Sequence, residues 1–253
     1  MKLKTTILLI LGIVYATGAF SADFDDGARY AFTVSSSERS VEILDLEMGL
    51  KSRSVKLDKK PGLIAASKGM NVLIISHPED KALTLVNLKS KEMQQYAFPL
   101  ELRPDFITLS PLDYNLAIYD AKNRTLEVQN IHRRQTITHI EDISSGELVS
   151  FSFDGSQLYV TEQERGQLLV IDLIKNSITH RVTLANKGAE LSALTRSIDG
   201  SYGFISDADK NVVYVVNLVN FEKIAEIHVG DKPARPWGTA DGGKIMVPNY
   251  GDG

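Results

Sequence analysis

The sequence predicts an all-β fold built from one four-stranded unit that repeats about every 42–45 residues. An Asp or Asn closes one apolar strand of each unit, with spacings of 42, 43, 42 and 45 residues: Asp45, Asn87, Asn130, Asp172 and Asn217. Another short apolar strand begins fourteen residues before each of them, at Ala31, Leu73, Leu116, Leu158 and Gly203. Helical periodicity is absent. Short strands, tight turns and this period together are typical of β-propeller blades.

A hydroxyl residue stands six positions before each of these apolar strands from the second unit onward: Ser67, Ser110, Ser152, Ser197 and Thr239. An Asp-Gly pair follows it in the last three copies, and Gly accepts the positive φ of a tight turn. Because the hydroxyl recurs in every unit, we expect it to cap the turn rather than to act as a nucleophile. In the fourth unit, the expected strands are 147–153, 158–162, 167–173 and 177–184.

A sixth copy of the apolar strand begins at Ile245, and the sequence ends where earlier units turn into their next strand. The sequence thus contains five repeats plus the start of a sixth, and we expect 22–253 to be a C-terminally incomplete propeller. The alternative is a closed five-bladed ring in which 234–240 completes the first blade. A β-sandwich has no reason to keep this register, and a parallel β-helix uses a shorter repeat.

Composition agrees with an ordinary globular domain, because 43% of the 253 residues are hydrophobic and 24% are charged. The formal net charge is −4 and no Lys/Arg run occurs, so no nucleic-acid partner is expected. The chain has no cysteine, which excludes disulfides, thiolate metal sites and covalent c-type haem attachment within it.

Residues 1–21 have the three-part pattern of a secretory signal peptide. Lys2 and Lys4 precede an apolar run, and small residues, Ala19 and Ser21, flank Phe20 before the expected cleavage point. The competing interpretation is an anchor helix, but the run is shorter than the roughly 20 residues that span a bilayer. We therefore expect a periplasmic or secreted protein with no membrane span after cleavage.

N-terminal sequencing of the exported protein should find Ala22 or Asp23 as its first residue, because the small residues at the expected cleavage point precede them. An intact Met1 would favour the anchor instead.

Three segments carry a resemblance to a known family: Leu158-Tyr159-Val160-Thr161-Glu162, Leu169-Val170-Ile171-Asp172 and Ile245-Met246-Val247-Pro248-Asn249. They resemble the YVTN-repeat β-propeller family, and the resemblance covers about residues 30–253. It implies a parent propeller with seven or eight blades, of which this chain is a truncated copy. Relatives by fold include the haem-binding propeller of periplasmic nitrite reductase and lactonases, so the resemblance makes haem a candidate cofactor.

Candidate ligand-binding residues follow from the propeller prediction, since the loops on one face usually carry the ligand. We expect this face to include Arg235, Trp237, Lys232, Asp231, His77 and Arg103. An Arg beside a Trp could hold a carboxylate or a flat ring. The structural alternative is that Trp237 packs between blades while Arg235 caps a carbonyl or pairs with an acid.

Four of the five histidines, all except His132, divide into two groups. His139, His180 and His228 fall on expected fourth strands, where a solvent-facing role is expected. His77 alone falls on the expected ligand-bearing face, where it is a candidate axial haem ligand or general base.

Neither a metal site nor a catalytic motif is present in the sequence. The function that we expect is therefore an exported binding scaffold for an unknown periplasmic protein or small ligand. A cofactor-bearing redox propeller resembling the nitrite reductase haem domain and a lactonase-like hydrolase are the alternatives. Propellers support many activities, so the fold does not choose between them.

Overall fold

A computed structural model describes residues 30–67, 69–90 and 92–251, and the expected signal peptide lies outside them. The described part is all-β apart from one short 3₁₀ helix, η1 (Pro78–Asp80). It contains no helix long and apolar enough to cross a membrane. The chain forms two compact units, Met1–Glu101 and Leu102–Gly253.

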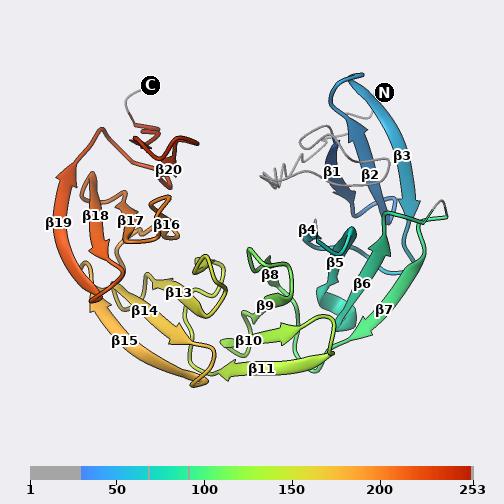
Figure 1. Ribbon diagram of the computed structural model, residues 1–253, viewed down its shortest axis with the longest axis horizontal. Coiled ribbons are helices and arrows are strands. Elements are labelled where there is room, and N and C mark those ends of the chain that lie inside the picture. The colour runs from blue at the N-terminus through green and yellow to red at the C-terminus, as the bar shows by residue number, and fades with distance from the viewer. Residues whose placement is uncertain (1–29, 68, 91, 252–253) are drawn as a thin grey trace, which may run out of the picture. The chain divides into compact units, whose positions relative to one another are not determined.

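The first unit contains two antiparallel sheets with the strand orders β1-β2-β3 and β4-β5-β6-β7 (Figure 1). Their bounds are β1 Tyr30–Ser35, β2 Ser40–Asp45, β3 Leu50–Lys56, β4 Ile64–Ser67, β5 Val72–His77, β6 Ala82–Asn87 and β7 Gln95–Pro99. The three-stranded sheet corresponds to the second, third and fourth strands of a repeat.

The second unit contains three four-stranded sheets and one two-stranded sheet. The first two sheets are β8 Phe106–Leu109, β9 Asn115–Asp120, β10 Thr125–Asn130 and β11 Gln135–Ile140, then β12 Val149–Phe151, β13 Gln157–Glu162, β14 Gln167–Asp172 and β15 Ser177–Thr183. The others are β16 Thr195–Arg196, β17 Tyr202–Asp207, β18 Val212–Asn217 and β19 Glu222–His228, then β20 Trp237–Gly238 and β21 Ile245–Met246.

These bounds confirm the predicted repeat of four antiparallel strands, and in the fourth repeat each observed strand lies within a few residues of its expected position. The sixth copy also has a partner, because Trp237 pairs with Met246 and Gly238 with Ile245. The five-bladed alternative assigned residues 234–240 to the first blade. Within that range, Trp237 and Gly238 instead pair with the sixth copy of the repeat.

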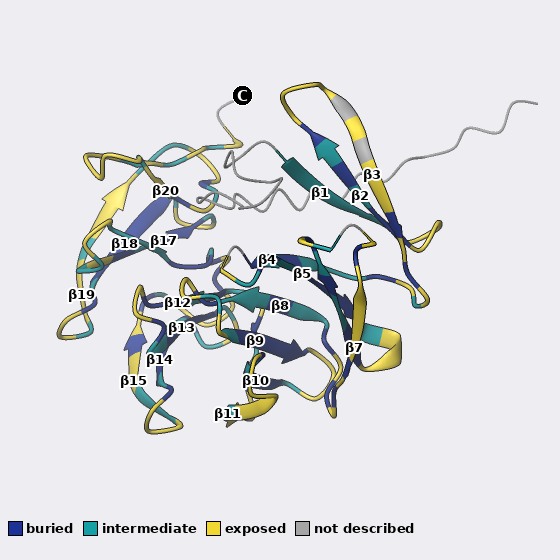
Figure 2. Ribbon diagram, turned by 45° about the vertical axis from the view of Figure 1, so that its right-hand side comes forward, coloured by how far each residue is buried: buried dark blue, intermediate teal, exposed yellow. Residues whose placement is uncertain are grey.

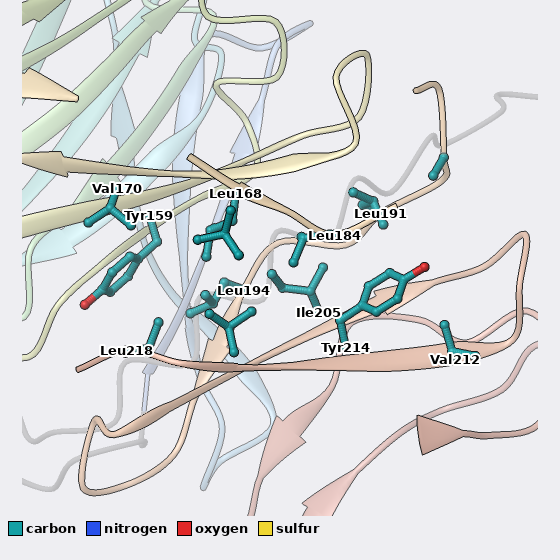
Figure 3. Close-up of a cluster of buried hydrophobic side chains, with 13 residues drawn as sticks. Tyr159, Leu168, Val170, Leu184, Leu191, Leu194, Ile205, Val212, Tyr214 and Leu218 are labelled. Atoms are coloured by element: carbon teal, nitrogen blue, oxygen red, sulfur yellow. The ribbon is translucent and has the colours of Figure 1, made fainter. Parts of the chain in front are cut away.

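The β12–β15 sheet is buried on both faces, which explains why its central strands, β13 and β14, are almost continuously apolar. Leu168 and Val170 of β14 belong to a core shared with the β16–β19 sheet, as Figure 3 shows. Leu169 and Ile171 belong to a second core shared with the β8–β11 sheet. Side chains alternate between the two faces of a strand, so β14 contributes to both cores at once.

Fourth strands are less covered than central ones (Figure 2). In β19 no residue is buried, whereas every residue of β18 except Asn217 is buried. Val182 of β15 is 7% exposed because the following sheet covers it. Ile227 occupies the matching register position in β19, opposite Val213, yet it is 49% exposed.

The repeated hydroxyl caps its turn as expected. Ser152 Oγ donates to Asp154 Oδ1 over 2.6 Å and accepts the backbone N–H of Gln157 over 2.9 Å. Gly155, with φ +68°, completes the turn. The same pattern of bonds recurs around Ser197 and around Thr239. The hydrogen bond from Ser152 is the main reason that the pKa of Asp154 is lowered.

The Asp or Asn that closes each third strand caps the turn that follows it. Asp172 Oδ1 accepts the backbone N–H groups of Ile174 and Lys175, and Asn217 Oδ1 accepts that of Val219. Short side chains that accept backbone N–H groups two or three residues ahead are favoured in turns. The periodic Asp or Asn is therefore a requirement of the turn.

Two glycines with nearly the same positive φ allow the energetic cost of backbone strain to be measured apart from the cost of crowding. A Cβ at Gly166 (φ +63°) would lie 2.4 Å from the carbonyl oxygens of Ala185 and Asn186, whereas a Cβ at Gly49 (φ +64°) would meet nothing within 4 Å. Gly49→Ala should lower the free energy of unfolding by about 1 kcal/mol, from strain alone. Gly166→Ala should lower it by about 2–5 kcal/mol, because the backbone carbonyls must also move. Urea unfolding of both variants tests this, and equal losses would contradict it.

Candidate anion-binding site

Arg235 connects the first strands of three consecutive sheets in the second unit. It lies just before β20, and its Nη2 donates to the Leu194 carbonyl oxygen over 3.0 Å and to Ser150 Oγ on β12 over 3.4 Å. Its Nε donates to Thr195 Oγ1 on β16 over 3.2 Å. The guanidinium therefore lies where β12, β16 and the approach to β20 come together.

Two side-chain hydrogen bonds fix this meeting of strands. Ser150 Oγ donates to the Leu194 carbonyl oxygen over 2.7 Å, and Thr195 Oγ1 donates to the Pro236 carbonyl oxygen over 2.6 Å. The first bond joins the β12 segment to the β16 segment, and the second joins the β16 segment to the β20 segment. The acceptors around Arg235 are thus held in place by the fold.

All acceptors of Arg235 are neutral. Among the described residues, no carboxylate forms an ion pair with it, and burial alone lowers the pKa of its guanidinium. The side chain nevertheless keeps an exposed surface. The predicted role as a carbonyl cap is confirmed by Leu194, whereas the alternative of an acid partner is not. The positive charge of Arg235 is left uncompensated at a place that solvent can reach.

Arg196, at the end of β16, is a second cation at this site. Its guanidinium carbon lies 3.9 Å from the centre of the Phe153 ring, and its Nη1 is buried without a hydrogen-bond partner. Burial lowers the pKa of Arg196, and the charge of Arg235 lowers it further, while Tyr159 and Asp154 act in the opposite direction. No carboxylate of the described residues forms an ion pair with it.

Sequence reasoning found Arg235 but missed Arg196, although the repeat contains the signal for both. Counting back from the turn hydroxyl, the positions that match Arg235 hold apolar residues in every other unit: Leu63, Phe106, Leu148 and Ala193. The positions that match Arg196 hold Ala66, Leu109, Phe151 and Gly238. A charge that replaces an apolar residue of the repeat is the kind of local exception that functional sites produce.

Of the other predicted residues, Trp237 lies nearest to Arg235 along the chain. It stands on β20 opposite Met246 and is 50% exposed, so it is not packed away between sheets. Asp231 and Lys232 lie in the linker between β19 and β20, where both are bonded to Asn211. Asn211 donates to Asp231 Oδ1 over 2.9 Å, and its side-chain oxygen accepts the backbone N–H of Lys232.

Arg103 and His77 each have partners within their own unit. Arg103 Nε pairs with Asp105 Oδ1 over 2.7 Å. His77 belongs to the other unit and is fully buried, with Nδ1 2.9 Å from the Lys60 carbonyl oxygen and Nε2 2.7 Å from Thr84 Oγ1. Since a carbonyl only accepts, Nδ1 carries the proton and Nε2 accepts from the Thr84 hydroxyl. Neither nitrogen is free to bind a metal.

The position of His77 is polar and buried in other units too. Asp120, Glu162 and Asp207 occupy the same place at the end of the second strand. Asp120 accepts the backbone N–H of Arg103, and Glu162 accepts that of Ser144, each from the linker that precedes its sheet. These residues attach the linker to the sheet, and His77 does the same through Lys60.

Three other histidines lie on fourth strands as predicted, with His139 on β11, His180 on β15 and His228 on β19. His139 Nδ1 lies 2.9 Å from Glu127 Oε1, which raises its pKa. Within the described ranges, no group of three or more His, Asp or Glu side chains could hold a metal ion.

Comparison with known proteins bears on the fold. No protein-family model and no curated protein matches the chain. Among solved structures, it is similar to "Dihydro-heme d1 dehydrogenase NirN in complex with DHE", with a TM-score of 0.74, 12% identity, and coverage of 89% of this chain and 51% of that one. The chain therefore spans about half the length of NirN.

Two further structures are similar. One is a functionally unknown protein from Desulfotomaculum acetoxidans DSM 771, with a TM-score of 0.70, 9% identity, and coverage of 88% of this chain and 73% of that one. The other is Hsv2 of Kluyvelomyces marxianus, with a TM-score of 0.64, 10% identity, and coverage of 88% and 80%. These neighbours are β-propeller proteins. At such low identity the likeness shows the fold alone, and the predicted β-propeller class is confirmed.

The buried neutral state of His77 should make stability depend on pH. Burial lowers its pKa below the ordinary value of about 6.5. As pH falls below about 6.5, the unfolded state takes up a proton that the folded state does not, so the free energy of unfolding should decrease by up to about 1.4 kcal/mol per pH unit.

Urea unfolding between about pH 5.5 and 7 measures this dependence, and the His77→Gln variant should lack it. Both proteins should also carry His139→Gln, because the raised pKa of His139 acts with the opposite sign. An unchanged slope in the His77→Gln variant would contradict a neutral, bonded imidazole.

Proposed function

We propose that this protein is a non-enzymatic binding propeller that holds an anionic group of its ligand on Arg235. The observation that carries the proposal is a partly exposed guanidinium whose only bonded partners are neutral, at the meeting point of three sheets. A solvent-accessible guanidinium that no carboxylate of the described residues pairs with is placed to bind an anion from outside.

A carboxylate suits this site well. A guanidinium has five N–H donors, and the hydrogen bonds from Arg235 use only its Nε and Nη2, leaving Nη1 for a ligand oxygen. Charge-assisted hydrogen bonds from Arg to a carboxylate are stronger than those between neutral groups. Because Ser150, Leu194 and Thr195 already orient the side chain, little conformational entropy is lost on binding.

The proposal includes export and a periplasmic or secreted ligand. Its support is the charged n-region and apolar run of residues 1–21, which match a secretory signal. The ligand is either a small molecule or an acidic group on a periplasmic protein.

Haem is the second candidate ligand, because the solved structures that share the fold include NirN, a dihydro-heme d1 dehydrogenase. The fit is partial. Arg235 could pair with a carboxylate of a macrocycle, but His77 has both ring nitrogens engaged and is not an axial ligand in this conformation. The absorption spectrum of protein purified from the periplasm distinguishes this candidate, since bound haem would give a Soret band.

Arg235→Met should weaken the binding of small carboxylates such as acetate and succinate, because it removes the charge and keeps much of the side-chain volume. A loss of about tenfold or more in affinity is expected for a charge-assisted hydrogen bond. Isothermal titration calorimetry measures the affinity, and the melting temperature reports on folding.

Arg181→Met is the matched control, since Arg181 is an exposed arginine on β15, away from the first strands. It should leave binding unchanged. Unaltered binding in Arg235→Met together with a large fall in melting temperature would mean that Arg235 is purely structural.

A further inference from the structure

We propose that the ligand carries two anionic groups, of which one binds Arg235 and the other binds Arg196. This inference rests on the proposed function and deepens it by naming a dianion, with short dicarboxylates as the simplest members of the class. It assigns Arg196 as the residue that distinguishes dianions from monoanions.

The two guanidiniums contact the same short stretch of chain. Arg235 contacts Ser150 on β12, and Arg196 lies over the ring of Phe153, three residues further along. Three extended residues span at most about 10 Å, so the backbone positions that the two arginines contact lie within about that distance of each other. Both arginines approach this stretch from sheets that follow it in the second unit, from β16 and from the segment before β20.

The fold holds Arg196 in place for such a contact. Its guanidinium lies over Phe153 at 3.9 Å, a geometry in which the ring attracts the cation. The Phe153 ring in turn packs against Gly200, where an added Cβ would lie 3.1 Å from a ring carbon. Arg196 therefore has a fixed platform on the turn of the neighbouring sheet.

Electrostatics favours two negative charges over one. The two guanidiniums repel each other, and no carboxylate of the described residues forms an ion pair with either. A monoanion on Arg235 removes only part of this uncompensated charge. A dianion neutralises both cations and replaces the repulsion with two attractions.

Comparison of the repeated units supports a joint role of Arg196 and Arg235 in binding. Each replaces an apolar or small residue that the other units keep, and the two replacements occur in consecutive sheets. Together they place two positive charges close to each other, without an ion pair among the described residues, which favours a ligand with two negative charges.

Calorimetric titration with acetate, malonate, succinate, glutarate and adipate tests the inference on the whole chain at constant ionic strength. We expect at least one dicarboxylate to bind about tenfold or more tightly than acetate, because a second charge-assisted contact is added. Affinity should rise from malonate to a longer member, since the anions must reach two separate cations.

Arg196→Gln should reduce the affinity for the best dicarboxylate by about tenfold or more, to near that for acetate, and should reduce acetate affinity much less. Arg196→Lys keeps the charge and should retain part of the preference. Arg181→Met should behave as the unaltered protein. If Arg196→Gln fails to fold, the Arg196→Lys variant and the chain-length series still decide the question.

The outcomes separate this inference from the proposed function. If neither acetate nor any dicarboxylate binds, the anion site itself is wrong, and both proposals fall. If acetate and the dicarboxylates bind equally and Arg196→Gln changes neither, the anion site stands and the role of Arg196 is overturned.

Discussion

The burial of central strands from both faces is the constraint on which the rest of this structure depends. A strand such as β14 has no solvent-facing side, because Leu168 and Val170 pack toward one neighbouring sheet and Leu169 and Ile171 toward the other. Most polar side chains therefore lie at strand ends and in turns, and a buried one within a strand, such as Glu127 of β10, is hydrogen-bonded to Gln129 and His139. The turn hydroxyls, the closing Asp or Asn and the buried acids at the ends of second strands all occupy such places.

The candidate site arises from the same constraint. A charged side chain beside packed sheets needs polar or charged partners. Among the described residues, Arg235 donates to neutral acceptors and Arg196 lies over an aromatic ring. Their pKa values are lowered, first of all, by burial. The two positions thus concentrate uncompensated charge where the regular repeat would hold apolar side chains.

The fold was predictable from the sequence because the turn chemistry repeats with it. Asp154-Gly155 and Asp172 mark their turns through local hydrogen bonds that depend on residue type and spacing alone. The site was only half predictable. Arg235 was expected on a ligand-bearing loop, but Arg196 was overlooked because it lies inside a strand, where its neighbourhood depends on Phe153 in another sheet. The hydrogen bonding of His77 could not be predicted for a similar reason, since the Lys60 carbonyl that it contacts is 17 residues away in the sequence.

The pairing of strands has a consequence for how the chain reaches this structure. Every ladder in the described sheets joins strands that follow each other directly in the sequence, so hairpins close over short loops. Short loops lose little entropy on closure and favour rapid formation. Packing between sheets then links mostly sequence neighbours, as Val182 with the sheet that follows it, although Arg235 also reaches Ser150 two sheets earlier. A chain of this kind can gain or lose a repeat in evolution while each remaining sheet keeps the contacts that fold it.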